Sequence, residues 1–281
     1  MNKKNIRSNR NKYIKSAIVL LIVIALLLFC SYQNRHLETT YYTYKAEHLD
    51  AEFDGYRIVQ ISDLHNAKFG KNNQKLVDRI RECEPDMIVL TGDLVDSNHT
   101  NVDRAVQFVD EIVKICPVYY VTGNHEYWLE ASEYDELMSG LTGAGAVILD
   151  DQVVEISRGD AKFRLVGLDD RSLSDGTLEA LLSDEKELTV VLAHEPQYLA
   201  RYAGTGVDLV LSGHAHGGQF RLPFVGGIVA PDQGFLPEYT AGEYYMNGTE
   251  MIVSRGLGNS VIPVRLFNYP EIVCVELVRK H

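Results

Sequence analysis

Cysteine is scarce in this 281-residue sequence and follows no pattern. The four cysteines, Cys30, Cys83, Cys116 and Cys274, are scattered and form no CxxC pair. They therefore predict neither a disulfide framework nor a cysteine-bound structural zinc site, and we interpret them as small hydrophobic residues. Their pattern leaves the redox compartment open. The sequence also contains no low-complexity segment and no repeat of solenoid period, which favours a single folded domain.

Basic residues are scarce after the N-terminus. Six of the 27 lysines and arginines lie within the first fifteen residues, and no acidic residue precedes Glu38. The rest of the chain holds 39 acidic residues against 21 basic ones, a net charge of −18. Tight binding to a nucleic-acid backbone requires many lysine and arginine contacts. A nucleic-acid substrate or partner is therefore not expected.

Charge is absent from residues Ala17–Cys30, which are almost all strongly apolar. With its neighbours from Tyr13 to Tyr32, this run reaches the ~20 residues that a membrane span needs. No small-x-small cleavage pattern, lipobox or twin-arginine pair accompanies it, so an uncleaved signal anchor is favoured over a cleaved signal peptide. Because positive charge stays on the cytoplasmic side, the rest of the chain is expected outside the membrane.

The predicted organisation therefore has four parts. They are a basic cytoplasmic tail at residues 1–15, a transmembrane signal anchor at 16–32, a polar, tyrosine-rich linker at 33–50 and one extracytoplasmic domain at 51–281. This arrangement predicts a single-pass protein of the cell membrane with its N-terminus in the cytoplasm. The export route stays open.

Strand-like and helix-like segments alternate from Tyr56 onward. The strand-like segments are residues 57–61, 87–90, 118–121, 163–167, 188–192 and 207–211, and the helix-like ones are 72–83 and 102–115. Two more strand-like stretches, 251–253 and 271–278, follow near the C-terminus. Such an alternation followed by strands predicts an α/β domain with two packed sheets flanked by helices.

Five short polar clusters each follow one of the apolar, strand-like segments. They are Asp63-Leu64-His65, Gly92-Asp93, Gly123-Asn124-His125-Glu126, His194-Glu195-Pro196 and Gly213-His214-Ala215-His216-Gly217-Gly218-Gln219. The carboxyl ends of strands form the binding crevice of an open α/β sheet, so these side chains are expected to converge. Side-chain alternation along a strand would let Asp63 and His65 face one point, and likewise His214 and His216. The glycines at 92, 123 and 213 would let the backbone turn sharply.

The chemistry of these clusters points to metal ions. Carboxylate, imidazole and amide ligands suit manganese, iron or zinc, and the absence of cysteine ligands argues against a structural zinc site. Two such ions that share a bridging carboxylate lower the pKa of a common water and orient it for attack on phosphorus. Asp93 is the natural candidate for the bridge. The clusters therefore predict two divalent ions and a phosphoester hydrolase.

Taken in this order, the motifs closely resemble the calcineurin-like metallophosphoesterase superfamily, from about Tyr56 to the C-terminus. The resemblance implies a four-layer α/β/β/α sandwich, preceded here by the transmembrane helix. It implies that one ion is held by Asp63, His65 and His216 and the other by Asn124, His194 and His214, with Asp93 shared. It also implies that His125 hydrogen-bonds the phosphate and protonates the leaving group, which suits the pKa of histidine.

Further motifs resemble the membrane-anchored bacterial branch of this superfamily. They are GHAHGGQ (213–219), GLDD (167–170) and the segment 254–272. This branch resembles phosphodiesterases with proposed phospholipid or nucleotide-diphosphate-sugar substrates. Ala215 stands where threonine is commoner, and strand alternation is expected to turn it away from the ions.

The sequence thus predicts a membrane-anchored, dinuclear-metal phosphodiesterase or pyrophosphatase that breaks P–O bonds by metal-hydroxide attack, with lipid-linked phosphates as candidate substrates. Two alternatives are a phosphomonoesterase and a catalytically silent binding protein on the same fold. The filled ligand positions argue against the second, whereas pocket shape, not metal ligands, separates monoesterase from diesterase. Candidate substrate contacts are Tyr127, Trp128 and Arg255, although packing at a helix start explains the first two equally well.

Overall fold

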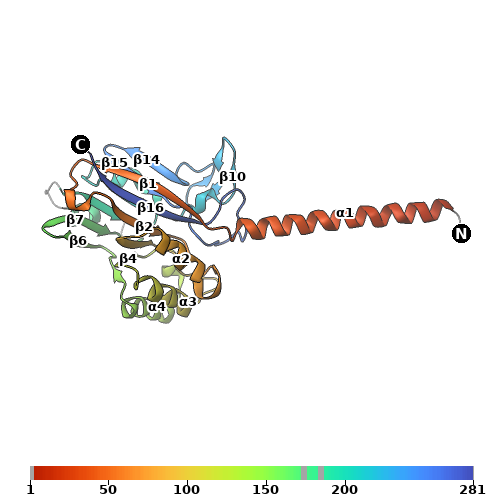
Figure 1. Cartoon of the computed structure of the whole chain (residues 1–281), viewed down its shortest axis with the longest axis horizontal. Helices are drawn as coiled ribbons and strands as arrows, with labels where there is room; N and C mark the ends of the chain where they lie inside the picture. The colour runs from red at the N-terminus through yellow and green to blue at the C-terminus, as the bar shows by residue number, and fades with distance from the viewer. Residues whose placement is uncertain (1–2, 172–175, 183–186, 281) are drawn as a thin grey trace.

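The computed structural model describes residues 3–171, 176–182 and 187–280. Helix α1 (Lys3–Gln33) projects away from the folded part of the chain (Figure 1). Its segment Tyr13–Gln33 has 21 residues and a mean hydropathy of 2.7. At 1.5 Å per residue it is about 32 Å long, which is long enough to cross the hydrocarbon core of a bilayer. The predicted anchor at 16–32 lies within this segment.

Two six-stranded sheets form the domain. The first sheet has the order β1-β16-β2-β3-β4-β5, with β1 at Glu38–Ala46, β16 at Glu271–Arg279, β2 at Tyr56–Ile61, β3 at Met87–Thr91, β4 at Val118–Val121 and β5 at Val147–Ile148. Strands β2 to β5 run parallel, β16 runs antiparallel to β2, and β1 runs parallel to β16. The carboxyl ends of β2, β3 and β4 therefore meet at one edge of the sheet.

Strand β1 corrects the prediction of a linker at residues 33–50. It pairs with β16 along its whole length, from Glu38 opposite Glu271 to Ala46 opposite Arg279. Its run of threonine and tyrosine favours a strand over coil. At the end of the strand, the Ala46 side chain is buried. Only the four residues 34–37 thus separate α1 from the folded domain.

The second sheet also has six strands but differs at its edges. Its order is β14-β15-β9-β8-β7-β6, with β14 at Gly242–Met246, β15 at Thr249–Val253, β9 at Leu209–Ser212, β8 at Thr189–Leu192, β7 at Ala161–Gly167 and β6 at Gln152–Arg158. The four inner strands run parallel, and the two edge strands form antiparallel hairpins with their neighbours. The central strands β8 and β9 are the most apolar, and all their residues are buried because both faces of this sheet are covered there.

Helices cover the outer face of each sheet. The helices are α2 (Gln74–Glu82), α3 (Val102–Ile112) and α4 (Ala131–Ala144) on the first sheet, and α5 (Thr177–Leu181) and α6 (Leu199–Tyr202) on the second. Alternate residues of β2 divide between two cores: Val59 and Ile61 pack under the helices, and Ile58 packs between the sheets. These layers confirm the predicted α/β/β/α sandwich. Figure 1 shows α3 and α4 as its lower layer.

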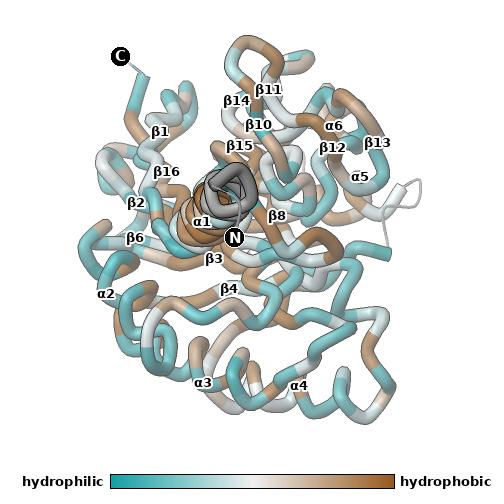
Figure 2. Tube along the Cα trace, turned by 90° about the vertical axis from the view of Figure 1, so that its right-hand side faces the viewer, coloured by the Kyte–Doolittle hydropathy of each residue, from teal (hydrophilic) through white to brown (hydrophobic). Residues whose placement is uncertain are grey.

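Two short hairpins lie between β9 and β14. They are β10 (Arg221–Leu222) with β11 (Gly226–Gly227), and β12 (Val229–Ala230) with β13 (Gly234–Phe235). Figure 2, which views the molecule along α1, shows β10 and β11 above α1 and β12 and β13 to its upper right, and Figure 1 shows β10 toward the side from which α1 leaves the domain. They follow directly on the last of the five polar clusters.

Candidate dinuclear metal site

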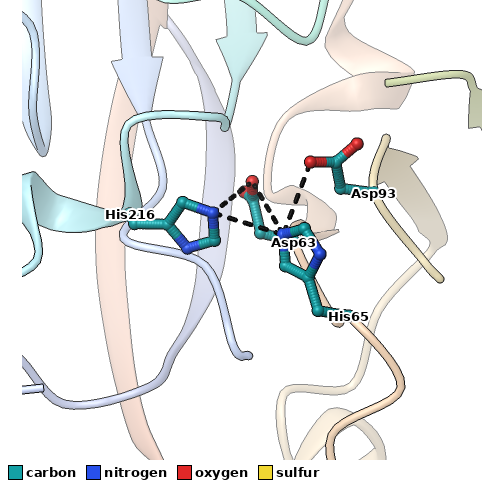
Figure 3. Close-up of side chains that lie close together, drawn as sticks. All are labelled: Asp63, His65, Asp93 and His216. Carbon is teal, nitrogen blue, oxygen red and sulfur yellow. Dashed lines mark hydrogen bonds and ion pairs between the residues drawn. The ribbon is translucent and has the colours of Figure 1, made fainter. Parts of the chain in front are cut away.

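A first cluster of buried ligand atoms lies past the ends of β2 and β9 (Figure 3). The Nε2 atoms of His65 and His216 are 3.2 Å apart. The Asp63 Oδ1 atom lies 3.6 Å from the His216 Nε2 and 3.9 Å from the His65 Nε2. These atoms converge on one point, as ligands of a single ion do.

A second cluster lies beside the first, past the ends of β4, β8 and β9. The His194 Nε2 atom is 3.2 Å from the Asn124 Oδ1 and 3.1 Å from the His214 Nδ1. Here an amide oxygen and two imidazole nitrogens converge.

Asp93 joins the two clusters. Its Oδ2 atom lies 3.4 Å from the His65 Nε2 in the first cluster and 3.4 Å from the His194 Nε2 in the second. Its other oxygen, Oδ1, accepts a hydrogen bond of 2.9 Å from the backbone N–H of His125. A single carboxylate oxygen thus stands between two groups of ligand atoms.

Left-handed backbone, not strand alternation, produces this convergence. Strand β2 ends at Ile61 and β9 ends at Ser212, so the paired motifs lie beyond the strands. Five of the seven predicted ligand residues have positive φ values between 44° and 63°, namely Asp63, His65, Asp93, His214 and His216. Such conformations cost about 1–3 kcal/mol each in residues other than glycine and are concentrated at functional sites. Strand alternation was therefore the wrong cause for the convergence of these ligands. It also does not set the direction of Ala215, which lies beyond the end of β9.

The three cluster glycines serve two different purposes. Gly92 has a φ of +85°, which permits the sharp turn before Asp93. Close approach requires glycine at all three positions, since a Cβ at Gly92 would also collide with His194. A Cβ at Gly123 would collide with Asp93 and His194, and one at Gly213 would collide with Asp63.

The protonation states suit a divalent cation. Burial lowers the pKa of His65 to about 3, and burial together with the nearby Arg265 lowers that of His216 well below its ordinary value. Both rings are therefore neutral, the form in which imidazole binds a metal. Burial alone would raise the pKa of Asp93, but His194 and His65 outweigh it and lower that pKa well below its usual range. Burial would lower the pKa of His194, but the Asp93 carboxylate outweighs it and raises that pKa well above its ordinary value. A metal ion that binds His194 must therefore displace a proton from it. The carboxylate and imidazole donors fit manganese, iron or zinc.

Two further hydrogen bonds orient the second cluster. The His194 Nδ1–H donates to the Thr91 carbonyl at 2.8 Å, and the His214 Nε2–H donates to the Asp232 Oδ2 at 2.8 Å. Each bond leaves the opposite ring nitrogen free to bind a metal. No sequence pattern indicated a role for Asp232, which lies in the turn between β12 and β13, outside the five polar clusters.

Glu126 fixes the loops that carry Asp93 and Asn124. Its carboxylate is buried and accepts hydrogen bonds from the backbone N–H groups of Asp93 (2.9 Å), Leu94 (2.9 Å) and Gly123 (2.8 Å). Glu126 belongs to the Gly123-Asn124-His125-Glu126 cluster, but its residue type alone assigned it no role. A carboxylate directly after Gly-Asn-His, among residues expected to be buried, was the available indication.

His125 lies between the site and the loop at Ser260. Its Nδ1 accepts a 3.2 Å bond from the Ser97 backbone N–H, which assigns the proton to Nε2. The Nε2 atom lies 3.0 Å from the Ser260 Oγ. The His125 ring is 4.5 Å from that of His65, centroid to centroid. A proton donor thus stands directly beside the first cluster.

The three predicted substrate contacts differ in their surroundings. The Trp128 ring is 62% exposed and lies 4.7 Å from the ring of His125, so it is open to a ligand. Tyr127 donates a 2.6 Å hydrogen bond to Asp169. The Arg255 guanidinium is paired at 2.8 Å with both Glu38 and Glu271.

Of these three residues, the structure therefore brings one to the site. Trp128 lies beside the clusters, whereas the polar groups of Tyr127 and Arg255 are already engaged by carboxylates of the protein. Their predicted contact with substrate has no support in the geometry, because a guanidinium held by two carboxylates is not available to a phosphate.

Asp170, from the GLDD motif, is a further carboxylate near the second cluster. Its Oδ1 atom is buried and has no hydrogen-bond partner among the described residues. Burial raises its pKa, which the nearby His194 opposes. The GLDD motif contributed to the resemblance with the membrane-anchored bacterial branch, but it predicted no role for Asp170.

Known proteins resemble this chain over most of its length. A family model described as calcineurin-like phosphoesterase matches residues 56–218. The metallophosphoesterase YkuE of Bacillus subtilis (strain 168) is 32% identical over 262 residues, which are 89% of this chain and 88% of that protein. The phosphodiesterase YaeI of Escherichia coli (strain K12) is 30% identical over 228 residues, which are 79% of this chain and 82% of that protein.

A solved structure resembles the chain more distantly. The sulfate thiohydrolase SoxB of Thermus thermophilus superposes with a TM-score of 0.50 and 12% identity, over 80% of this chain and 57% of that one. At this identity the likeness extends to the fold alone.

Proposed function

The chain belongs to the calcineurin-like phosphoesterase family, and from this premise we propose that it is a membrane-anchored, two-metal phosphodiesterase. Family membership makes it a metal-dependent phosphoester hydrolase. The observation that carries the finer proposal is the position of the Asp93 Oδ2, 3.4 Å from one histidine of each cluster. That spacing suits a carboxylate shared by two ions.

The proposed ligand sets follow the two clusters. One ion would be held by Asp63, His65 and His216 and the other by Asn124, His194 and His214, and Asp93 would be shared between the two sets. Ions bound there supply a water of lowered pKa and positive charge beside the phosphoryl oxygens. Manganese, iron and zinc all suit these donors, and availability decides among them.

The chain's own residues prepare the rest of the reaction. Glu126 and the Thr91 carbonyl hold Asp93 and His194 in place by hydrogen bonds to buried partners. His125 keeps its proton on Nε2, directed away from Ser97 and toward the Ser260 Oγ. In the proposed reaction it donates this proton to the oxygen of the leaving group, which is the harder step for an alcohol than for a nitrophenol.

Two observations favour a diester at a membrane. One relative of similar length is a phosphodiesterase. Helix α1 is long and apolar enough to span a bilayer, and its N-terminal flank is basic, which favours a cytoplasmic N-terminus and an extracytoplasmic domain. Phospholipids and lipid-linked phosphates or pyrophosphates are therefore the proposed substrate class.

Steady-state turnover of the full-length protein in detergent tests this proposal. Bis(p-nitrophenyl) phosphate and p-nitrophenyl phosphate are compared after treatment with a chelator and again after Mn²⁺ is restored. We expect metal-dependent turnover of the diester that exceeds that of the monoester by about 10-fold or more, since the pocket and not the ions sets this ratio.

Either of two results would redirect the assignment. A preference for the monoester would make the protein a phosphatase. No turnover of either compound while two ions remain bound, measured by metal analysis of the same sample, would make it a binding protein on this fold.

A further inference from the structure

The last turn of α1 is packed against the domain. The Phe29 and Phe267 rings are in edge contact, with centroids 5.9 Å apart. The Asn34 side chain donates to the Pro263 carbonyl at 2.7 Å and accepts from the Arg265 N–H at 2.8 Å. With four residues between α1 and β1, these contacts fix the direction in which the helix leaves the domain.

The segment 263–267, which contacts the end of α1, is also linked to the metal site. The fully buried Arg265 guanidinium donates to the carbonyls of Arg255 (2.8 Å) and Gly258 (2.6 Å). The Gly258 N–H in turn donates to the Asp63 carbonyl at 2.6 Å. The helix therefore leaves the domain at the end where the candidate metal site lies, and Figure 2 views that end.

Exposed apolar side chains gather at this end. Among the described residues outside α1, eleven large apolar side chains are exposed. Eight of these are Trp128, the hairpin residues Leu222, Phe224, Val225, Phe235 and Leu236, and the later residues Val261 and Phe267. Six of them define what we call the apolar rim: Trp128, Phe224, Val225, Phe235, Val261 and Phe267. Single exposed apolar residues are ordinary, but their concentration at one end marks a contact surface.

Hydrogen bonds tie the parts of the rim to the site. The β10–β11 hairpin, which carries Phe224, is bonded to the segment 263–267: the Arg221 N–H donates to the Leu266 carbonyl at 2.9 Å. The Ile228 N–H, at the start of the next hairpin, donates to the Gly218 carbonyl at 3.0 Å. These hydrogen bonds hold the two hairpins of the rim against the segment that contacts α1 and against the loop that carries His216.

The contact of Phe267 with α1 sets the depth of this border. Phe29 lies within the candidate span Tyr13–Gln33, four residues or about 6 Å before its end. A side chain that touches Phe29 is therefore at the boundary between headgroups and acyl chains, which amphipathic surfaces enter to a depth of about 5–10 Å. Aromatic residues are enriched at this level of a membrane.

We propose that the apolar rim is a membrane-contacting surface that seats the catalytic end of the domain on the bilayer from which α1 emerges. The occupant of this surface is the lipid itself. Charge agrees with this choice. Lys68, Lys71 and Arg104, with one acidic residue, Asp103, line a cavity of about 380 Å³. This cavity lies beside the loop that carries His65, where the Arg104 guanidinium donates to the Asn66 carbonyl at 2.9 Å. Basic groups at a bilayer surface attract anionic headgroups.

This inference rests on the proposed function for its consequence. A phosphodiester in a lipid headgroup lies within reach of a site that faces the bilayer, so the lipid need not leave the membrane to be cleaved. The substrate class thereby narrows to phosphodiesters carried by membrane lipids.

Trp128 provides a built-in probe, because it is the one tryptophan in the sequence. The full-length protein is reconstituted in vesicles of phosphatidylcholine with or without bromine near the carboxyl end of the acyl chains. Contact of the rim with lipid predicts a loss of about half of the tryptophan emission in the brominated vesicles. No loss would overturn the proposal.

Two variants give a matched comparison. In a Trp128→Phe background, tryptophan replaces either Phe224 on the rim or Tyr245, which is 68% exposed and lies at the opposite end of the second sheet. Quenching at position 224 and none at position 245 is expected. Equal quenching at both positions, or a rim that cross-links to a second copy of the chain and is not quenched, would overturn the proposal.

Turnover separates this proposal from the proposed function. Phe224→Ser with Val225→Ser is expected to leave hydrolysis of bis(p-nitrophenyl) phosphate unchanged and to lower cleavage of phospholipid in vesicles about 10-fold. If the quenching pattern is found but phospholipid is not cleaved, the membrane-contacting surface is supported and the proposed lipid substrate is contradicted. If the soluble diester is not cleaved either, the phosphodiesterase assignment fails while the surface still stands.

Discussion

The two ligand clusters share Asp93 but are oriented by different forces. In the second cluster, hydrogen bonds from His194 to the Thr91 carbonyl and from His214 to Asp232 fix the rings and their tautomers. In the first cluster, the Nδ1 atoms of His65 and His216 are buried without a hydrogen-bond partner among the described residues. Packing orients these rings instead, because they stack on each other with centroids 4.9 Å apart.

This difference predicts which substitutions weaken metal binding in each cluster. A ring held by hydrogen bonds is disturbed when its partner is removed, whereas a ring held by packing is disturbed when its space is filled. The first cluster has little spare space: a Cβ at Gly258 would come within 3.0 Å of the His65 Cβ and closer still to the Leu64 carbonyl. Substitutions outside the ligand set should therefore separate the two clusters.

Loss of the shared carboxylate should have the largest effect, because it removes the common element. Asp93→Asn is expected to lower turnover of bis(p-nitrophenyl) phosphate on the order of 10³-fold, since charge beside the reacting phosphorus is lost. Metal analysis of the full-length variant should find fewer than two ions per chain. The amide can still accept the His125 N–H, so the unfolding temperature of the chelated protein should change little.

Asp110→Asn is the matched control for this variant. Asp110 is an exposed residue of α3 whose carboxylate pairs with Lys114. Its replacement should alter neither metal content nor turnover, because exposed ion pairs contribute little. An Asp93→Asn protein that kept both ions and full turnover would show that the clusters do not share a carboxylate.

The next effect should be confined to the first cluster. Gly258→Ala introduces a methyl group against His65, and overpacking of this kind costs about 1–3 kcal/mol. Affinity for one of the two ions is therefore expected to fall about 10- to 100-fold, with the other unchanged, in a calorimetric Mn²⁺ titration of the full-length protein. Gly143→Ala serves as the control, because nothing lies within 4 Å of the methyl group that it adds.

Much of the fold was predictable because it depends on local patterns. Buried parallel strands produce uninterrupted apolar runs, so β3 and β4 were found within a residue of their ends. Strand β1 was missed because its partner, β16, lies more than 200 residues away in the sequence. Without that partner, a run of threonine and tyrosine with few aliphatic residues resembles a linker.

The chemistry of the site was predictable from residue types, and its geometry was not. Every predicted cluster residue lies at the same edge of the sandwich, but the roles of individual residues as metal ligands stay a prediction. The left-handed backbone at Asp63 and His214 leaves no trace in a one-letter sequence, because neither residue is glycine. Asp232 also escaped, since a carboxylate in a turn is ordinary until the fold places a histidine beside it.

Asp232 supplies the complementary and smallest test of the comparison. Its side chain is 63% exposed, so solvent screens it and its loss should cost less than a change in the buried cluster. Asp232→Ala removes the acceptor for the His214 Nε2–H, and affinity for one ion should fall about 10-fold in the same Mn²⁺ titration. The ion affected should be the one that Gly258→Ala leaves unchanged.

Asp232→Asn decides whether this effect comes from orientation or from charge. The amide oxygen still accepts the histidine N–H but carries no charge, so rescue of most of the lost affinity is expected if Asp232 acts by fixing the tautomer of His214. An Asn variant as weak as the Ala variant would assign the effect to charge. If Asp232→Ala and Gly258→Ala weakened the same step of the titration, the two clusters would not be independently oriented, and the contrast between hydrogen bonding and packing would not hold.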